Sequence, residues 1–171
     1  MVTREDVENK MKSNFDSVRA LVSNLRNLKA AINSSNACTV IEVAGVNYTI
    51  ANAIARLRAL DDEKSVLGSI SYQYKQVVEG VRKTNEKVLN PDNEADYLSK
   101  ILGPDSKKNI DLYNSLRDQY RISNTMYVID PNNLEEQLPK WQKDIEDFEA
   151  NVHNALVASN ISTTIDVEFE D

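Results

Sequence analysis

The chain has 171 residues, which fits one domain whose core is large enough to be stable without disulfides or metal ions. Its 27 acidic and 20 basic side chains give a formal net charge of −7, and this balance disfavours a broad surface that follows a nucleic-acid backbone but still allows a local basic pocket. Its single cysteine, Cys38, excludes an intramolecular disulfide and a thiolate metal cluster within one chain.

Only four glycines and four prolines leave little room for loops and predict a mostly helical protein. The first residues lack the apolar region of a secretory signal, and no window of about 18 residues is free of charge. We therefore expect a soluble, cytoplasmic protein (in the host cytoplasm if the chain is viral).

The first predicted helix starts at Thr3, which pairs with Asp6 as a helix cap, and ends at the turn formers 33–36. Its apolar residues form a stripe at helical spacing: Val7, Met11, Phe15, Val18, Leu21, Val22, Leu25, Leu28 and Ile32. A lone helix would expose this stripe, so the stripe predicts a partner helix.

Residues 39–50 follow as a predicted β-hairpin with a turn at Ala44-Gly45. Thr49 then caps a long helix that should end near Leu89, because Pro91 disfavours a helical residue before it.

Residues 90–109 form the irregular part of the chain. We expect a turn at 90–93, two helical turns at 94–102, a helix at 105–119 and a short strand at 126–129.

The last forty residues carry the clearest pattern. Residues 132–159 have apolar side chains at a mean spacing near 3.5, which predicts one long helix, with Pro139 either kinking it or preceding its true start. Residues 161–169 alternate apolar and polar side chains, which predicts a strand placed to join the hairpin.

These elements predict a mainly α (α+β) fold over residues 1–171 as a single domain. It would be a long antiparallel helical bundle or coiled coil with a three-stranded β element, made of hairpin 39–50 and strand 161–169. Stripes this long over thin cores also predict a homo-oligomer.

The sequence offers little for catalysis. It lacks the phosphate-binding, dinucleotide-binding and nucleophile-elbow motifs, and its only histidine is His153. The simplest interpretation of its many carboxylates is that they lie on the solvent-exposed faces of helices. We expect a protein that is not an enzyme, with no catalytic residues, no cofactor and no metal.

Two places favour ligand binding. One is Arg56, just after the hairpin; the other is a run in which tyrosines alternate with arginines and an amide: Arg117, Tyr120, Arg121, Asn124 and Tyr127. Arginine forks suit phosphate and a tyrosine face can stack on a base. The alternative is that the tyrosines fill core and the arginines form surface ion pairs.

Residues 40–56, a hairpin leading into a helix, and residues 128–167 resemble the septicolysin-like family of small helical proteins of bacteria and phages. The resemblance covers about half the chain and implies a long-helix bundle with a small β end, and an oligomer. It implies no catalytic residues. Residues 90–108 and the run Arg56-Leu57-Arg58 depart from the pattern.

Three functions follow. The first is a non-enzymatic oligomeric binding protein, phage-encoded, that sequesters a small anionic signal of the nucleotide type. The second is a structural or adaptor coiled coil that acts through protein–protein contacts. The third is an enzyme built on carboxylates and one histidine. None of them involves extended nucleic-acid binding or a membrane.

Overall fold

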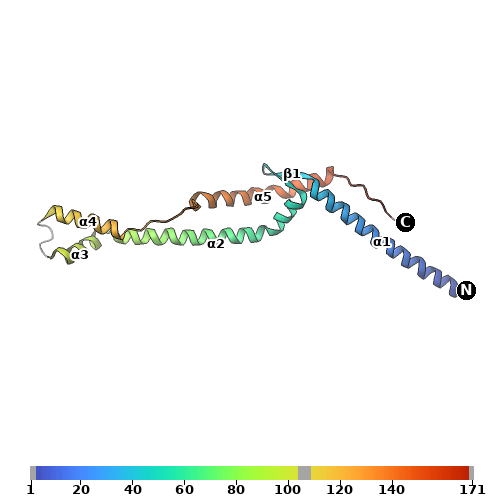
Figure 1. Ribbon diagram of the computed structural model, residues 1–171, viewed down its shortest axis with the longest axis horizontal. Coiled ribbons are helices and arrows are strands. Elements are labelled where there is room, and N and C mark those ends of the chain that lie inside the picture. The colour runs from blue at the N-terminus through green and yellow to red at the C-terminus, as the bar shows by residue number, and fades with distance from the viewer. Residues whose placement is uncertain (1–2, 104–108, 170–171) are drawn as a thin grey trace. The chain divides into compact units, whose positions relative to one another are not determined.

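The computed structural model describes residues 3–103 and 109–169, and it is mainly helical with one small antiparallel sheet. The helices are α1 (Arg4–Cys38), α2 (Ile50–Val88), α3 (Pro91–Leu102), α4 (Ile110–Asn124) and α5 (Leu134–Ser162), and the strands are β1 (Val40–Val43) and β2 (Val46–Thr49) (Figure 1). This confirms the mainly α prediction and the long last helix.

The contacts divide the chain into two compact units. The hairpin unit comprises residues up to 63 and from 143 onward, and the middle unit comprises residues 64–142. That residues 1–171 form one domain stays a prediction.

Helix α1 begins as the sequence predicts. Thr3 accepts a hydrogen bond from the Asp6 backbone N–H at 3.1 Å, and Asp6 accepts one from the Thr3 backbone N–H at 2.8 Å, which is a capping box. The predicted end at 33–36 is wrong, since α1 runs on to Cys38. Asparagine and serine only weakly disfavour a helix, and this stretch has no glycine or proline to stop it.

The hairpin prediction is confirmed. Val40 pairs with Thr49 and Val43 with Val46, and the two-residue turn has positive φ at Ala44 (51°) and Gly45 (81°). Positive φ at both turn positions matches the right-handed twist of the strands. Thr49 then accepts a hydrogen bond from the Asn52 backbone N–H, so the hairpin leads directly into α2.

The third strand is a wrong prediction. The described sheet contains only β1 and β2, helix α5 takes in Ile161 and Ser162, and residues 163–169 have no regular structure. Alternating apolar and polar residues form a strand only where a sheet edge is available to pair with them. Here the helical hydrogen bonds continue instead, and the Thr163 N–H donates to the Ser159 carbonyl.

The predicted strand at 126–129 is also wrong. The side-chain amide of Asn85 pairs with the backbone of Met126 in both directions, accepting from its N–H at 2.8 Å and donating to its carbonyl at 2.9 Å. One side chain therefore satisfies the backbone groups that a neighbouring strand would otherwise have paired.

Between these segments the helices differ slightly from prediction. Helix α3 starts at Pro91, earlier than expected, because Asn90 caps it and a proline is tolerated in the first turn. Of the helix expected at 105–119, residues 105–108 lie outside the described residues, and α4 covers the rest and runs on to Asn124. Helix α5 begins at Leu134, so Pro139 lies inside it and the later start is wrong.

Each unit has its own core. In the hairpin unit the buried apolar residues come from β1, α2 and α5: Ile41, Val43, Ile50, Ala53, Leu60, Ile145, Phe148 and Val152. In the middle unit they are Leu67, Val88, Leu98 and Leu138. Helix α1 contributes no buried residue.

Candidate functional site

Arg56 lies in the hairpin unit, where it joins β2, α2 and α5. Its Nη1 donates to the Tyr48 hydroxyl at 2.7 Å, and its guanidinium carbon lies 4.4 Å from the centre of the Phe148 ring. Tyr48 meets Phe148 edge to face, with ring centres 5.4 Å apart. This cation–π cluster joins β2 of the hairpin to helices α2 and α5.

Two carboxylates complete the cluster. Nη2 of Arg56 donates to Asp144, and its Nε donates to Glu63 at 3.4 Å, while only 19% of the Arg56 side chain is exposed. Burial works to lower the pKa of Arg56, but the hydrogen bonds to Asp144, Tyr48 and Glu63 outweigh it and raise that pKa. An incoming phosphate would have to displace one of these carboxylates. Arg56 thus ties three elements together, and its role as a ligand residue stays a prediction.

The other predicted residues lie in the middle unit. Arg117 lies three and four residues before Tyr120 and Arg121, and Asn124 lies four and three residues after them, so α4 places all four along one face. Arg121 reaches α3, where its Nη2 donates to Glu94 at 2.8 Å and its Nε donates to the second carboxylate oxygen. Only 7% of the Glu94 side chain is exposed. The hydrogen bond to Glu94 raises the pKa of Arg121.

The same face of α4 uses its tyrosine for packing. The Tyr120 ring lies on the Tyr97 ring of α3, with centres 4.4 Å apart, and α3 lies beside α4 in Figure 1. Asn124 donates to the Tyr120 carbonyl at 2.7 Å, and Arg117 pairs with its neighbour Asp118 at 3.2 Å. Tyr127 follows the helix and is 81% exposed. Tyr120 and Arg121 therefore join α3 to α4, Arg117 and Asn124 contact other residues of α4, and Tyr127 is exposed to solvent.

Sequence reasoning missed the partners that define both clusters. Glu63 is seven residues, or two helical turns, after Arg56, a spacing that could have been noticed. Asp144 is 88 residues away, and Glu94 is 27 residues from Arg121, so no local pattern marks either of them.

A hollow of about 610 Å³ in the middle unit was also missed. Its lining includes Gly68, Tyr72 and Lys75 of α2, and Leu138 and Pro139 of α5. A Cβ added to Gly68 would meet nothing within 4 Å, so the glycine faces open space. The hollow is wide enough for a small molecule, and polar side chains also line it: Ser71, Tyr74, Glu135 and Gln142.

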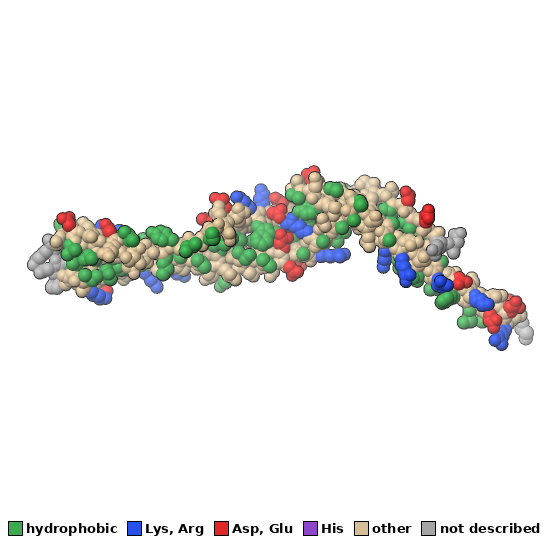
Figure 2. All heavy atoms as spheres, viewed as in Figure 1, with side chains coloured by type: hydrophobic (Ala, Val, Ile, Leu, Met, Phe, Trp, Pro, Cys, Tyr) green, Lys and Arg blue, Asp and Glu red, His purple; other side chains and the backbone are tan. Residues whose placement is uncertain are grey.

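The least ordinary surface of the hairpin unit is the apolar stripe of α1. The large apolar side chains along it are exposed to solvent: Val7, Met11, Phe15, Val18, Leu21, Val22, Leu25 and Ile32. Leu21, for example, is 68% exposed. Figure 2 shows hydrophobic side chains at the surface of α1. Soluble monomers rarely leave a continuous apolar strip of this length uncovered.

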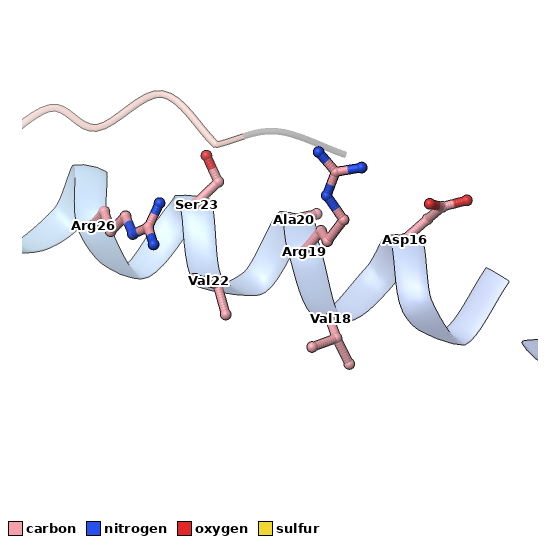
Figure 3. Close-up of a pocket in the computed structure, with 7 residues that line it drawn as sticks. All are labelled: Asp16, Val18, Arg19, Ala20, Val22, Ser23 and Arg26. Atoms are coloured by element: carbon pink, nitrogen blue, oxygen red, sulfur yellow. The ribbon is translucent and has the colours of Figure 1, made fainter. Parts of the chain in front are cut away.

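The C-terminal segment, residues 163–169, does not cover this stripe. Figures 1 and 3 show it running beside α1, on the side toward which Arg19 and Ser23 point. Val18 and Val22 point to the other side of the helix (Figure 3). A groove lined by Asp16, Arg19 and Arg26, among others, lies along this part of α1. The segment therefore follows the polar face of α1 and leaves the apolar face open.

Within residues 3–103 and 109–169, no group of three or more His, Cys, Asp or Glu side chains is placed to hold a metal ion. Cys38 and His153 are both exposed. In the part of the chain that the structure describes, every helix is too short or too polar to cross a bilayer.

No protein-family model, no curated protein and no solved structure matches this chain. The resemblance of residues 40–56 and 128–167 to the septicolysin-like family therefore rests on those residues alone.

Proposed function

We propose that this chain is a structural or adaptor protein without enzymatic activity, which works by pairing α1 lengthwise with another helix in a coiled coil. The single observation that carries the proposal is the exposed stripe from Val7 to Ile32. Covering apolar surface releases about 25 cal/mol per Å², so a stripe of this length strongly favours a bound helix over water.

The arginine clusters support this ranking of the hypotheses. Each predicted arginine has a carboxylate partner: Arg56 has Asp144 and Glu63, Arg121 has Glu94, and Arg117 has Asp118. A phosphate site needs guanidinium donors that the ligand can reach. The apolar stripe of α1, by contrast, can bind a partner helix without breaking any of these ion pairs.

Thiol alkylation tests the proposal. In a Cys38→Ser background, Val18→Cys places one thiol on the stripe, and Ser13→Cys places one on the opposite face as a matched control. We expect Val18→Cys to react several-fold more slowly than Ser13→Cys, either in the purified protein or after an extract of the producing cell is added. Equal rates in both settings would contradict the proposal.

Sequestration of a small nucleotide-type anion by an oligomer is the second candidate. It is favoured by Tyr127, whose ring is open for stacking, and by Arg117, which pairs with its neighbour Asp118 on the same helix and with no residue of α3 among the described contacts. The purified protein would be heated to release bound nucleotides, and Arg117→Ala should reduce the amount released. This candidate fails if Arg117→Ala, Arg121→Ala and Arg56→Ala all leave the released amount unchanged.

Phage origin and cytoplasmic location stay predictions.

A further inference from the structure

Helix α1 carries a complete heptad pattern. Positions 7, 11, 14, 18, 21, 25, 28 and 32 alternate in steps of four and three, and all but Asn14 are apolar. The first set of core positions is Met11, Val18, Leu25 and Ile32; the second is Val7, Asn14, Leu21 and Leu28. A repeat sustained over more than three heptads is the seam of a coiled coil rather than one face of a globular core.

The partner of this seam has to match its length. From Val7 to Ile32 the seam spans about 37 Å at 1.5 Å per residue. Within the hairpin unit, α5 already buries its own stripe, with Ile145, Phe148 and Val152 inside. The C-terminal segment lies on the other face of α1. A second copy of α1 supplies a seam of the same length and period.

Charge decides the direction of the pair. The acidic residues of α1 are all in its first half: Glu5, Asp6, Glu8 and Asp16. Residues 17–38 carry Arg19, Arg26 and Lys29 and no acidic residue. Residues 4–16 also carry Arg4, Lys10 and Lys12, so their net charge is −1, while that of residues 17–38 is +3. A parallel pair would set the two +3 halves side by side, whereas an antiparallel pair sets each of them against the half of charge −1.

The flanking positions fix the register of the antiparallel pair. When the core layers join Val18 to Leu21 and Met11 to Leu28 of the second copy, the residues beside the seam also meet. Glu8, which accepts a hydrogen bond from the exposed Arg4 of its own helix at 2.8 Å, then also faces Lys29 of the second copy, and Phe15 faces Val22. A parallel pair offers no opposite charges at these positions, since Lys10 would face Phe15 and Asn24 would face Lys29.

We propose that α1 pairs antiparallel with α1 of a second copy, in the register that joins Val7 to Ile32 and Glu8 to Lys29. The proposal rests on the function proposed above and names its partner. The pair has a two-fold axis near residues 19 and 20, so every contact occurs twice. Both Glu8–Lys29 contacts flank an apolar seam and draw the two copies into one register.

Cysteine crosslinking tests direction and register together. Full-length Cys38→Ser protein carrying Val7→Cys is mixed with the same protein carrying Ile32→Cys, and both are oxidised. We expect the mixed disulfide to dominate. Crosslinks of each variant to itself would show a parallel pair and overturn the proposal, because antiparallel pairing holds like residues about 37 Å apart.

A monomeric product without crosslinks would also overturn the second copy as partner. The alkylation experiment separates this failure from failure of the proposed function. Val18→Cys protected only after cell extract is added would mean that another protein covers the stripe. In that case the adaptor function stands and the self-pairing proposal falls.

A charge exchange tests the register independently. Glu8→Lys should weaken self-association about tenfold, since two ion pairs become two repulsive contacts. The double variant Glu8→Lys/Lys29→Glu should restore the original affinity. Glu5→Lys, with the same charge change on the outer face, should weaken it much less. If the double variant stays as weak as Glu8→Lys, the register is wrong.

Discussion

Helices α1 and α5 both carry long apolar stripes, but the stripes end in different surroundings. In the hairpin unit α5 buries Ile145, Phe148 and Val152, and the Phe148 ring contacts Tyr48 of β2 and Arg56 of α2. Helix α1 is joined to the same hairpin and buries no residue. An apolar stripe therefore predicts that a helix has a partner but does not say whether that partner belongs to the same chain.

The largest effect on the free energy of unfolding should appear when one phenylalanine ring is removed from each stripe and the two variants are compared. Phe148→Ala removes a ring that is 1% exposed and should lower the free energy of unfolding by about 3–5 kcal/mol. Phe15→Ala removes a ring that is 63% exposed and should change that free energy by less than about 0.5 kcal/mol in dilute protein. Urea unfolding of both variants at low protein concentration measures the contrast, and a large loss in Phe15→Ala would show that α1 packs within its own chain.

The next effect concerns the cluster that holds α5 to the hairpin. Arg56→Ala removes the guanidinium that pairs with the partly buried Glu63 and with the more exposed Asp144, and should lower the free energy of unfolding by about 2 kcal/mol. Arg58→Ala, on the exposed side of the same helix, is the control and should change stability little. Equal unfolding midpoints for the two variants would mean that the cluster does not stabilise the hairpin unit.

A smaller effect should appear at the start of α1, which depends on local contacts because it buries nothing. Thr3→Ala removes the cap that accepts from the Asp6 N–H, and should destabilise the first turns of the helix by about 1 kcal/mol. Amide hydrogen exchange of residues 5–10 should accelerate while exchange in α5 stays unchanged. Acceleration in both helices would show that α1 and α5 unfold together.

The smallest effect is a pH dependence at the same cap. The hydrogen bonds from the Thr3 side chain and backbone lower the pKa of Asp6 below its ordinary value of 3.8. A lowered carboxylate pKa stabilises the helix start above pH 3.8, and this contribution is lost as the pH falls through the lowered value. Acidification below pH 4 should fray the first turn of α1 in the wild type, and Asp6→Asn should abolish that pH dependence.

The parts of the fold that the sequence predicted well are those set by neighbours in the chain. The capping box at Thr3, the register of the hairpin and the length of α5 all follow from residues a few positions apart. The strand at 161–169 failed for the opposite reason. Its alternation is real, but the structure extends α5 instead and gives the segment no sheet edge.

The candidate sites show the same division. Arginine and tyrosine spacing drew attention to Arg56 and Arg121, but whether an arginine binds a ligand depends on which carboxylates reach it. Asp144 and Glu94 come from distant parts of the sequence and occupy the guanidinium donors. The exposed stripe of α1 was visible in the sequence, but only the structure shows that no described residue of α1 is buried.

The distance between two copies of α1 tests the account most directly. A spin label on Ser34→Cys, on the outer face of the helix in a Cys38→Ser background, reports that distance by pulsed electron paramagnetic resonance on the full-length protein. Antiparallel pairing in the proposed register predicts a separation of about 44 Å between the labelled backbones. A separation near the distance between two packed helices, about 10 Å plus the reach of the labels, or no distance between copies at all, would contradict it.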